Sequence, residues 1–182
     1  MNLTLTGNTD DDQDQSIDSF KSVMTHLLHQ FGASNTLSIQ VKKRGYSPLG
    51  GGVVQVTQQY AKKLESASLI DEGKVKRIRG LVTSAKVSPQ LTTRVVDKLR
   101  EIFNDYIPDV WISTDHYKKG QCGEQPGYAV SLVAETTTGM IITKDFNFGN
   151  KKEFIMPEDL GERAALAMLD EIFSGGCIDS NN

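Results

Sequence analysis

The sequence contains little cysteine, a single tryptophan and no long apolar run. Two cysteines among 182 residues are too few for a disulfide framework or for the four ligands of a structural zinc site. No run of about eighteen apolar residues is present, so we expect neither a membrane-spanning helix nor a membrane partner. Residues 1–15 lack the basic and apolar regions that are typical of a secretory signal. We therefore expect a protein of a reducing compartment without a structural metal site.

Charge is distributed unevenly along the chain. Residues 1–36 carry a net charge of −4, residues 37–100 of +9 and residues 101–182 of −8. A basic middle segment can present one positive face to RNA or phosphate. Alternatively, sheet twist and helix packing scatter its lysines and arginines over unrelated surfaces. The sequence leaves both arrangements open.

The first third of the chain predicts the order β-α-β-β. Residues 3–6 alternate like a short strand, and apolar residues at helical spacing from Ile17 to Phe31 predict an amphipathic helix. Alternation over 37–42 and strand-forming residues at 53–57 predict two strands, which the glycine-rich residues 44–52 join as a hairpin. This block is too small to bury its helix and strands unaided, so we expect it to be part of a larger sheet and the chain to be a fragment.

The remainder predicts β-α-β-β-β-α. Residues 74–85 predict a long strand or a bulged pair, and residues 110–114 predict a further strand. Between them, Ser88 and Pro89 are typical of a helix start. Because a helix connects these two strands, we expect them to run parallel. Residues 128–134 and 140–142 predict a hairpin, and Pro157 opens a last helix. The fold class is therefore α/β (α+β), and the second block has a thioredoxin-like order of elements.

The glycine-rich turn is the first candidate site. Gly50, Gly51 and Gly52 allow main-chain N–H groups to approach an anion, and Lys42, Lys43 and Arg44 add positive charge before them. No Gly-Lys-Ser/Thr follows, so the turn is not a nucleotide-binding P-loop. The alternative is a wide hairpin turn that needs positive φ angles.

The second candidate is the basic start of the long strand, formed by Lys74, Lys76, Arg77 and Arg79. These side chains predict contacts with RNA phosphates. The alternative is a charged edge strand that discourages aggregation. Aromatic residues for base stacking are sparse, so we do not expect sequence-specific reading of single strands.

Several motifs resemble the RNA 3′-terminal phosphate cyclase superfamily and occur in the same order over nearly the whole chain. Those shared with the superfamily are Arg44-Gly45-Tyr46-Ser47-Pro48-Leu49-Gly50-Gly51-Gly52, Ile78-Arg79-Gly80 and Ala134-Glu135-Thr136-Thr137-Thr138-Gly139. Those similar to its eukaryotic cyclase-like branch are Pro126-Gly127-Tyr128, Ser131-Leu132-Val133-Ala134-Glu135-Thr136, Pro157-Glu158-Asp159-Leu160-Gly161 and Gly175-Gly176-Cys177-Ile178-Asp179-Ser180. The resemblance implies a fold of repeated α/β units with one inserted smaller domain of thioredoxin-like topology.

By this resemblance, residues 1–66 are part of a cyclase-type repeat, 67–176 are the insert and 177–182 begin the next, truncated repeat. Cyclases use a histidine in a C-terminal segment to accept AMP from ATP, and the resemblance places that segment outside this chain. It therefore implies no catalytic residue, no metal and no cofactor here. Among nucleotide-contacting positions only Pro48 has a match, and Leu49 replaces a residue that is often basic or small.

The cyclase-like branch implies a non-catalytic factor of early pre-rRNA processing and small ribosomal subunit assembly in the nucleolus of the nucleus. Its expected partners are pre-rRNA, a large nucleolar GTPase and other small-subunit assembly factors. Two alternatives remain. One is an RNA 3′-terminal phosphate cyclase that forms 2′,3′-cyclic phosphate ends through a histidine–AMP intermediate, and the other is a pre-rRNA endonuclease.

Overall fold

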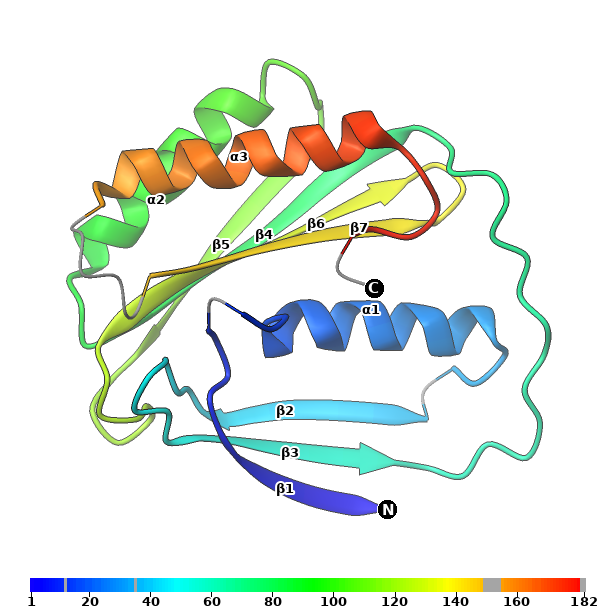
Figure 1. Ribbon diagram of the computed structural model, residues 1–182, viewed down its shortest axis with the longest axis horizontal. Helices are drawn as coiled ribbons and strands as arrows, with labels where there is room; N and C mark the ends of the chain where they lie inside the picture. The colour runs from blue at the N-terminus through cyan, green and yellow to red at the C-terminus, as the bar shows by residue number, and fades with distance from the viewer. Residues whose placement is uncertain (12, 35, 149–154, 181–182) are drawn as a thin grey trace.

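The computed structural model describes residues 1–11, 13–34, 36–148 and 155–180, which form two sheets and three helices (Figure 1). In chain order the elements are β1 (Asn2–Gly7), α1 (Ile17–Gln30), β2 (Leu37–Lys43), β3 (Gly52–Gln58), β4 (Val75–Ala85), α2 (Pro89–Phe103), β5 (Val110–Tyr117), β6 (Gly127–Thr136), β7 (Ile141–Phe148) and α3 (Pro157–Ser174). None of the described helices is long and apolar enough to cross a membrane. Residues 181 and 182, the end of the segment expected to begin a further repeat, lie outside the described residues.

The strands pair as two separate sheets. The first has the order β1-β3-β2 and is antiparallel throughout. The second has the order β5-β4-β6-β7, in which β4 and β5 are parallel and the other pairs are antiparallel. Both predicted hairpins, the parallel pair and the predicted fold class are confirmed.

The main core lies between the four-stranded sheet and the helices α2 and α3, which cover one of its faces (Figure 1). Alternate residues of β4, β5 and β6 point into this core, and Ile78, Leu132 and Leu99 are fully buried in it. Helix α2 begins as predicted, with the Ser88 side chain accepting a hydrogen bond from the Gln90 N–H. Periodicity of two in the strands and 3.6 in the helices thus brings the apolar positions together.

Helix α1 lies between the two sheets and contacts β2 on one side and β6 and β7 on the other (Figure 1). Its first turn is held by Asp145 of β7, which accepts hydrogen bonds from the hydroxyl groups of Ser16 and Ser19 at 2.9 and 2.6 Å. The apolar residues of α1 keep more exposed surface than their spacing predicts, because the side of the helix that carries Ser16 and Ser19 faces β7. Phe20 and Phe31 keep 40% and 37% of their surface exposed.

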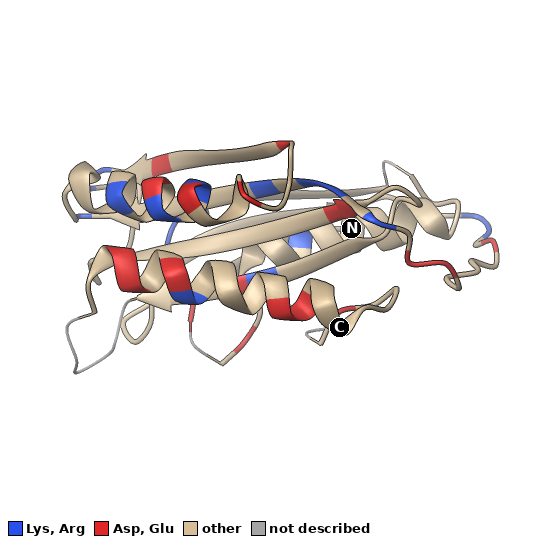
Figure 2. Cartoon of the chain, turned by 90° about the horizontal axis from the view of Figure 1, so that it is seen from above, with Lys and Arg blue, Asp and Glu red and all other residues tan. Residues whose placement is uncertain are grey.

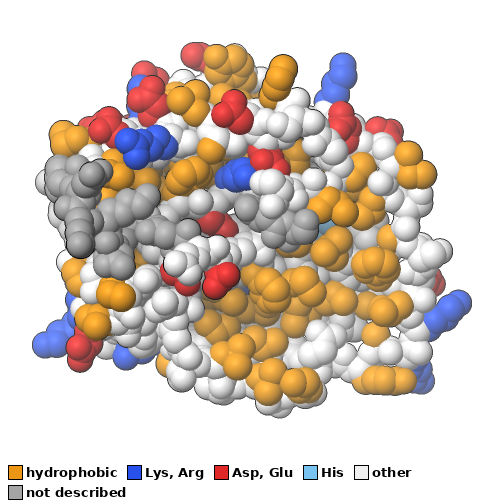
Figure 3. Space-filling view, in the orientation of Figure 1, with side chains coloured by type: hydrophobic (Ala, Val, Ile, Leu, Met, Phe, Trp, Pro, Cys, Tyr) orange, Lys and Arg blue, Asp and Glu red, His pale blue; other side chains and the backbone are white. Residues whose placement is uncertain are grey.

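The apolar face of the three-stranded sheet is covered at its centre, where Val54 and Ile39 are 6% and 3% exposed, and open along the edge strand β1. The register of β1 against β3 places Leu3 opposite Val56 and Leu5 opposite Val54, so these four side chains share one face. Leu3 and Leu5 remain 38% and 52% exposed. Figure 3 shows hydrophobic side chains gathered over α1 and this sheet. The described part of the first block thus leaves apolar surface uncovered, as its small size predicts.

A buried ion cluster joins the end of β2 to α1 and to the four-stranded sheet. The Arg44 guanidinium is 1% exposed and donates hydrogen bonds to Asp18 at 2.6 Å and to Asp10 at 3.3 Å. It also lies over the Tyr117 ring of β5, 5.1 Å from the ring centroid. Next to it, the fully buried Tyr46 donates its hydroxyl proton to Thr83 of β4 at 2.9 Å. We call Arg44, Asp10, Asp18 and Tyr117 the junction.

The junction holds one cation and two carboxylates, so one negative charge is in excess. Burial alone would lower the pKa of Arg44, but the two carboxylates raise it above its ordinary value, and Arg44 stays charged. Burial raises the pKa of Asp10 to about 6, against the opposing attraction of Arg44. One oxygen of Asp10, Oδ1, has no hydrogen-bond partner among the residues that the structure describes. Asp10 is therefore the carboxylate that takes up a proton most readily.

This excess charge predicts a pH-dependent stability. Because the folded-state pKa of Asp10 is about 6 and its ordinary value is 3.8, ionisation of Asp10 costs the folded state up to about 3 kcal/mol. The cost is absent below about pH 4, grows as the pH rises and is complete above pH 6. We expect Asp10→Asn, which mimics the protonated acid, to unfold with the same free energy as the unchanged protein at pH 4. At pH 8 the variant should be the more stable by up to about 3 kcal/mol.

Urea unfolding of both proteins between pH 4 and pH 8 measures this difference. Asp105→Asn, a change at an exposed position, serves as the control and should give a difference that is constant with pH. Parallel curves for Asp10→Asn and the unchanged protein would show that the junction carries no excess charge.

Candidate nucleic-acid interface

The glycine-rich loop packs tightly against the rest of the protein. Gly50 and Gly51 adopt φ angles of +60° and +76°, which favour glycine. Gly123, in the loop before β6, lies so close that an added Cβ atom would stand 1.9 Å from the Gly50 carbonyl oxygen. These glycines are therefore required by the close approach of two backbones.

In this packing, N–H groups of the loop and the Arg44 side chain, which were predicted to bind an anion, already have partners within the protein. The Gly50 N–H donates to the Tyr46 carbonyl at 2.8 Å, and the Arg44 N–H donates to the Gln121 carbonyl at 3.0 Å. Gly52 begins β3, where it pairs with Gly7 of β1. The Arg44 side chain is buried in the junction, so its charge is balanced by Asp10 and Asp18 instead of facing solvent. This geometry favours the hairpin-turn alternative, and anion binding here stays a prediction.

Three other residues near the loop remain accessible. Pro48, which follows a cis peptide bond, is exposed. Lys42 is exposed at the end of β2 with its Nζ 2.7 Å from Gln40 Oε1, and Lys43 is half-buried. These positions could meet phosphates at the surface without disturbing the junction.

The basic start of β4 is a cluster of cations that share two carboxylates. Lys76 and Arg77 both pair with Glu135 of β6, and Arg79 forms a two-pronged pair with Asp109 at 2.8 Å for each contact. Burial acts to raise the pKa of Glu135, but hydrogen bonds from the two cations lower it below its ordinary value. A hydrogen bond from Arg79 lowers the pKa of Asp109 in the same way.

Strand β4 lies between β5 and β6. From Ile78 onward β4 has a hydrogen-bonded neighbour on each side, so Arg79 does not mark a protective edge strand. Arg77 pairs with β6 alone and Lys74 precedes β4, so for Lys74, Lys76 and Arg77 the edge-strand alternative stays a prediction. The four side chains carry more positive charge than Glu135 and Asp109 balance, and Lys74 is exposed. The cluster therefore keeps an excess of positive charge at the surface.

The two basic groups lie far apart. The junction sits at the end of β4, where Ala85 pairs with Tyr117, whereas Lys76 and Arg77 sit at its beginning. The nine steps of strand from residue 76 to residue 85 span about 30 Å. Figure 2 shows the basic residues of α2 interspersed with acidic ones. Of the two arrangements of charge, the described residues adopt the scattered one.

Sequence reasoning missed a groove between α1 and the four-stranded sheet. It has a volume of about 380 Å³ and is lined by Asp18, Lys21, Ser22, Arg79, Gly80, Leu81, Trp111, Ser113, Ser131 and Val133. Trp111 is 65% exposed. Strand alternation could have found it, since Trp111 stands between Val110 and Ile112, which point to the opposite face.

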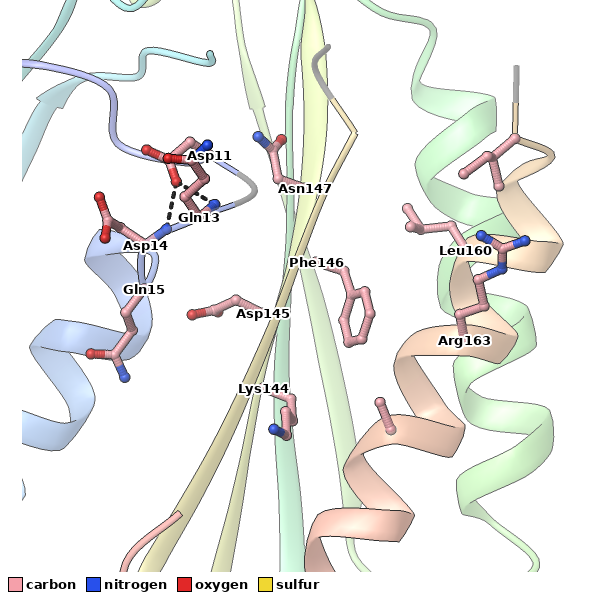
Figure 4. A pocket seen from close by; sticks show the side chains of 12 residues that line it. Asp11, Gln13, Asp14, Gln15, Lys144, Asp145, Phe146, Asn147, Leu160 and Arg163 are labelled. Atoms are coloured by element: carbon pink, nitrogen blue, oxygen red, sulfur yellow. Dashed lines mark hydrogen bonds between the residues drawn. The ribbon is translucent and has the colours of Figure 1, made fainter. Parts of the chain in front are cut away.

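A second pocket, of about 400 Å³, lies along β7 (Figure 4). Asp11 and Asp14 line one side, Leu160 and Arg163 of α3 line the other, and Asn147 projects between them. The Asn147 amide is buried and has no hydrogen-bond partner within the described part of the chain. The acidic side of this pocket would repel phosphate, so the pocket is a poor candidate for RNA.

The sequence of this chain matches one protein family and several known proteins. Residues 70–173 match the family described as RNA 3′-terminal phosphate cyclase (RTC), insert domain. The whole chain is 43% identical to a probable RNA 3′-terminal phosphate cyclase-like protein of Dictyostelium discoideum and covers 52% of it. It is 42% identical to the human RNA 3′-terminal phosphate cyclase-like protein and covers 50% of it.

An rRNA processing protein of Schizosaccharomyces pombe is 39% identical over 97% of this chain and 48% of its own length. The chain thus spans about half the length of the curated relatives it matches. The match over residues 70–173 and the similarity along the whole chain confirm the resemblance that the sequence motifs predict. The chain belongs to the RNA 3′-terminal phosphate cyclase family.

Proposed function

We propose that this chain is the RNA-binding and protein-binding middle part of a non-catalytic cyclase-like factor of early pre-rRNA processing and small-subunit assembly. Its RNA is pre-rRNA, its protein partners are a large nucleolar GTPase and other small-subunit assembly factors, and its place is the nucleolus. The rRNA processing protein of S. pombe, 39% identical to this chain, supports the process. The observation that carries RNA binding is the surface excess of positive charge at the start of β4.

The geometry of the glycine-rich loop supports a binding function without catalysis. Its glycines serve backbone packing and its arginine balances two buried carboxylates. The cyclase alternative predicts a covalent histidine–AMP product when the full-length factor meets labelled ATP, and our proposal predicts none. The endonuclease alternative predicts that Arg77→Gln or Arg79→Gln abolishes RNA cleavage without loss of binding.

The salt dependence of the RNA affinity gives the number of phosphate contacts. We expect binding of a structured pre-rRNA fragment to weaken as salt rises, because each phosphate contact releases counterions. The double change Lys74→Gln with Lys76→Gln removes two charges, and Arg77 still pairs with Glu135. The slope of log affinity against log salt should become less steep by about 1.8. Filter binding between 50 and 300 mM salt measures it.

The double change Lys42→Gln with Lys43→Gln tests the other basic group in the same way and should reduce the slope similarly. Lys62→Gln with Lys63→Gln alters two exposed lysines of the connector after β3, outside both groups, and is the matched control, expected to leave the slope unchanged. Binding by the unchanged protein that stays flat as salt rises would exclude phosphate contacts.

The outer face of α3 supports a protein partner. Asp159, Glu162, Leu166, Asp170 and Phe173 recur every three or four residues and so share one side of the helix. Leu166 and Phe173 are 49% and 93% exposed on this side. Figure 2 shows the acidic residues spaced along α3. An exposed apolar pair among acids fits a partner surface with an apolar pocket and basic rim.

This face predicts the effect of a double change, Leu166→Ser with Phe173→Ser. We expect it to weaken binding to the purified GTPase at least tenfold, since both side chains would lose their buried contacts in the complex. Titration calorimetry measures the affinity. Tyr60→Ser, at a side chain that is 86% exposed on the connector after β3, is the control and should bind normally. Equal affinity of the double variant and the control would remove α3 from the interface.

A further inference from the structure

The groove beside α1 has an open aromatic floor. Ile112 points into the core below α2 and α3, so its neighbour Trp111 points to the opposite face of the sheet. On that face α1 packs over β6 and β7, and the β4–β5 side carries the 65% exposed indole. Trp111 is thus a large flat side chain at the surface, with a wall of α1 on one side of the groove.

Cationic and hydroxyl groups surround this floor. The register of β4 and β5 places Arg79 directly beside Trp111, and Asp109 fixes the Arg79 guanidinium with two hydrogen bonds. Lys21 lines the α1 wall and has no ion-pair partner among the described residues. Ser22 and Ser113 donate their hydroxyl protons to the Asp18 and Gly80 carbonyls, and their oxygens can still accept a hydrogen bond from a ribose hydroxyl.

The acids near the groove are already paired. Asp18 lies 2.6 Å from Arg44, Asp109 binds Arg79, and Glu135 binds Lys76 and Arg77 one row along the same face. Lys21 makes no ion pair among the described residues and supplies a positive charge at the groove, beside Asp18, which shares Arg44 with Asp10. A ligand that complements the groove has a flat apolar part and an anionic part, and a nucleotide has both.

We infer that this groove binds an unpaired nucleotide of RNA, with the base stacked on Trp111 and a phosphate beside Lys21. The inference rests on the proposed RNA binding and adds its site: a single-stranded segment, held by stacking without base-specific hydrogen bonds. The volume of about 380 Å³ lies in the range of small-ligand pockets. Double-stranded RNA cannot use the groove, because its bases are already stacked on one another.

Trp111 is the only tryptophan of the chain, so its fluorescence reports on the groove alone. We expect a single-stranded octanucleotide to quench this fluorescence, and a duplex of the same sequence to leave it unchanged. Anisotropy of the labelled octanucleotide then gives affinities of variants. Trp111→Leu, which keeps an apolar side chain but no ring, should bind about tenfold more weakly, the loss expected for one stacked base. Trp111→Phe should restore most of the affinity.

Tyr106→Leu is the matched control, because Tyr106 is 68% exposed and does not line the groove. It should bind the octanucleotide like the unchanged protein. Equal affinities of Trp111→Leu and Tyr106→Leu, or fluorescence that responds to a peptide partner and not to RNA, would overturn the inference. Salt-dependent binding of structured pre-rRNA would still support the proposed function after either of these results. If the unchanged protein bound no RNA at all, both the proposed function and the groove site would be contradicted.

Discussion

The arrangement of this chain depends on one buried arginine. Arg44 stands at the end of β2, and its guanidinium binds Asp10 and Asp18 and covers the Tyr117 ring. It thereby ties the start of α1 and the turn of the first sheet to the end of the second. A buried cation of this kind adds little net stability when it is paired, but removing it leaves two unpaired carboxylates in the interior. The junction therefore fixes which surfaces of the two sheets meet.

The position of α1 follows from this constraint and decides what the chain can bind. Asp145 holds the first turn of α1 through Ser16 and Ser19, so the helix lies over the β6 and β7 side of the four-stranded sheet. The β4–β5 side of that face is left with an exposed tryptophan. Helices α2 and α3 cover the other face of this sheet. A ligand can therefore reach the sheet surface through the groove beside α1.

Local signals in the sequence were sufficient for the type and order of the elements, but not for the site or for the full length of β5 and β7, which were predicted only over 110–114 and 140–142. Alternation over 37–42 and the Ser88-Pro89 pair located β2 and α2 correctly, since strand and cap geometry depend on near neighbours. Arg44 binds Asp18 and Asp10, which lie 26 and 34 residues away in the sequence. No local pattern distinguishes such a buried arginine from an exposed one that can bind phosphate. In the same way, only the register of β4 shows that Arg79 lies between two strands whereas Arg77 pairs with β6 alone.

Hydrogen exchange of an Arg44→Met variant tests the central claim, that the junction couples the two sheets. In the unchanged protein we expect the amides of β2–β3 and of β4–β6 to open together. In the variant the β2–β3 amides should lose about 3–5 kcal/mol of protection, while those of β4–β6 lose much less, because the main core is intact. Protection of β2–β3 that survives the change, or equal losses in both sheets, would contradict the account.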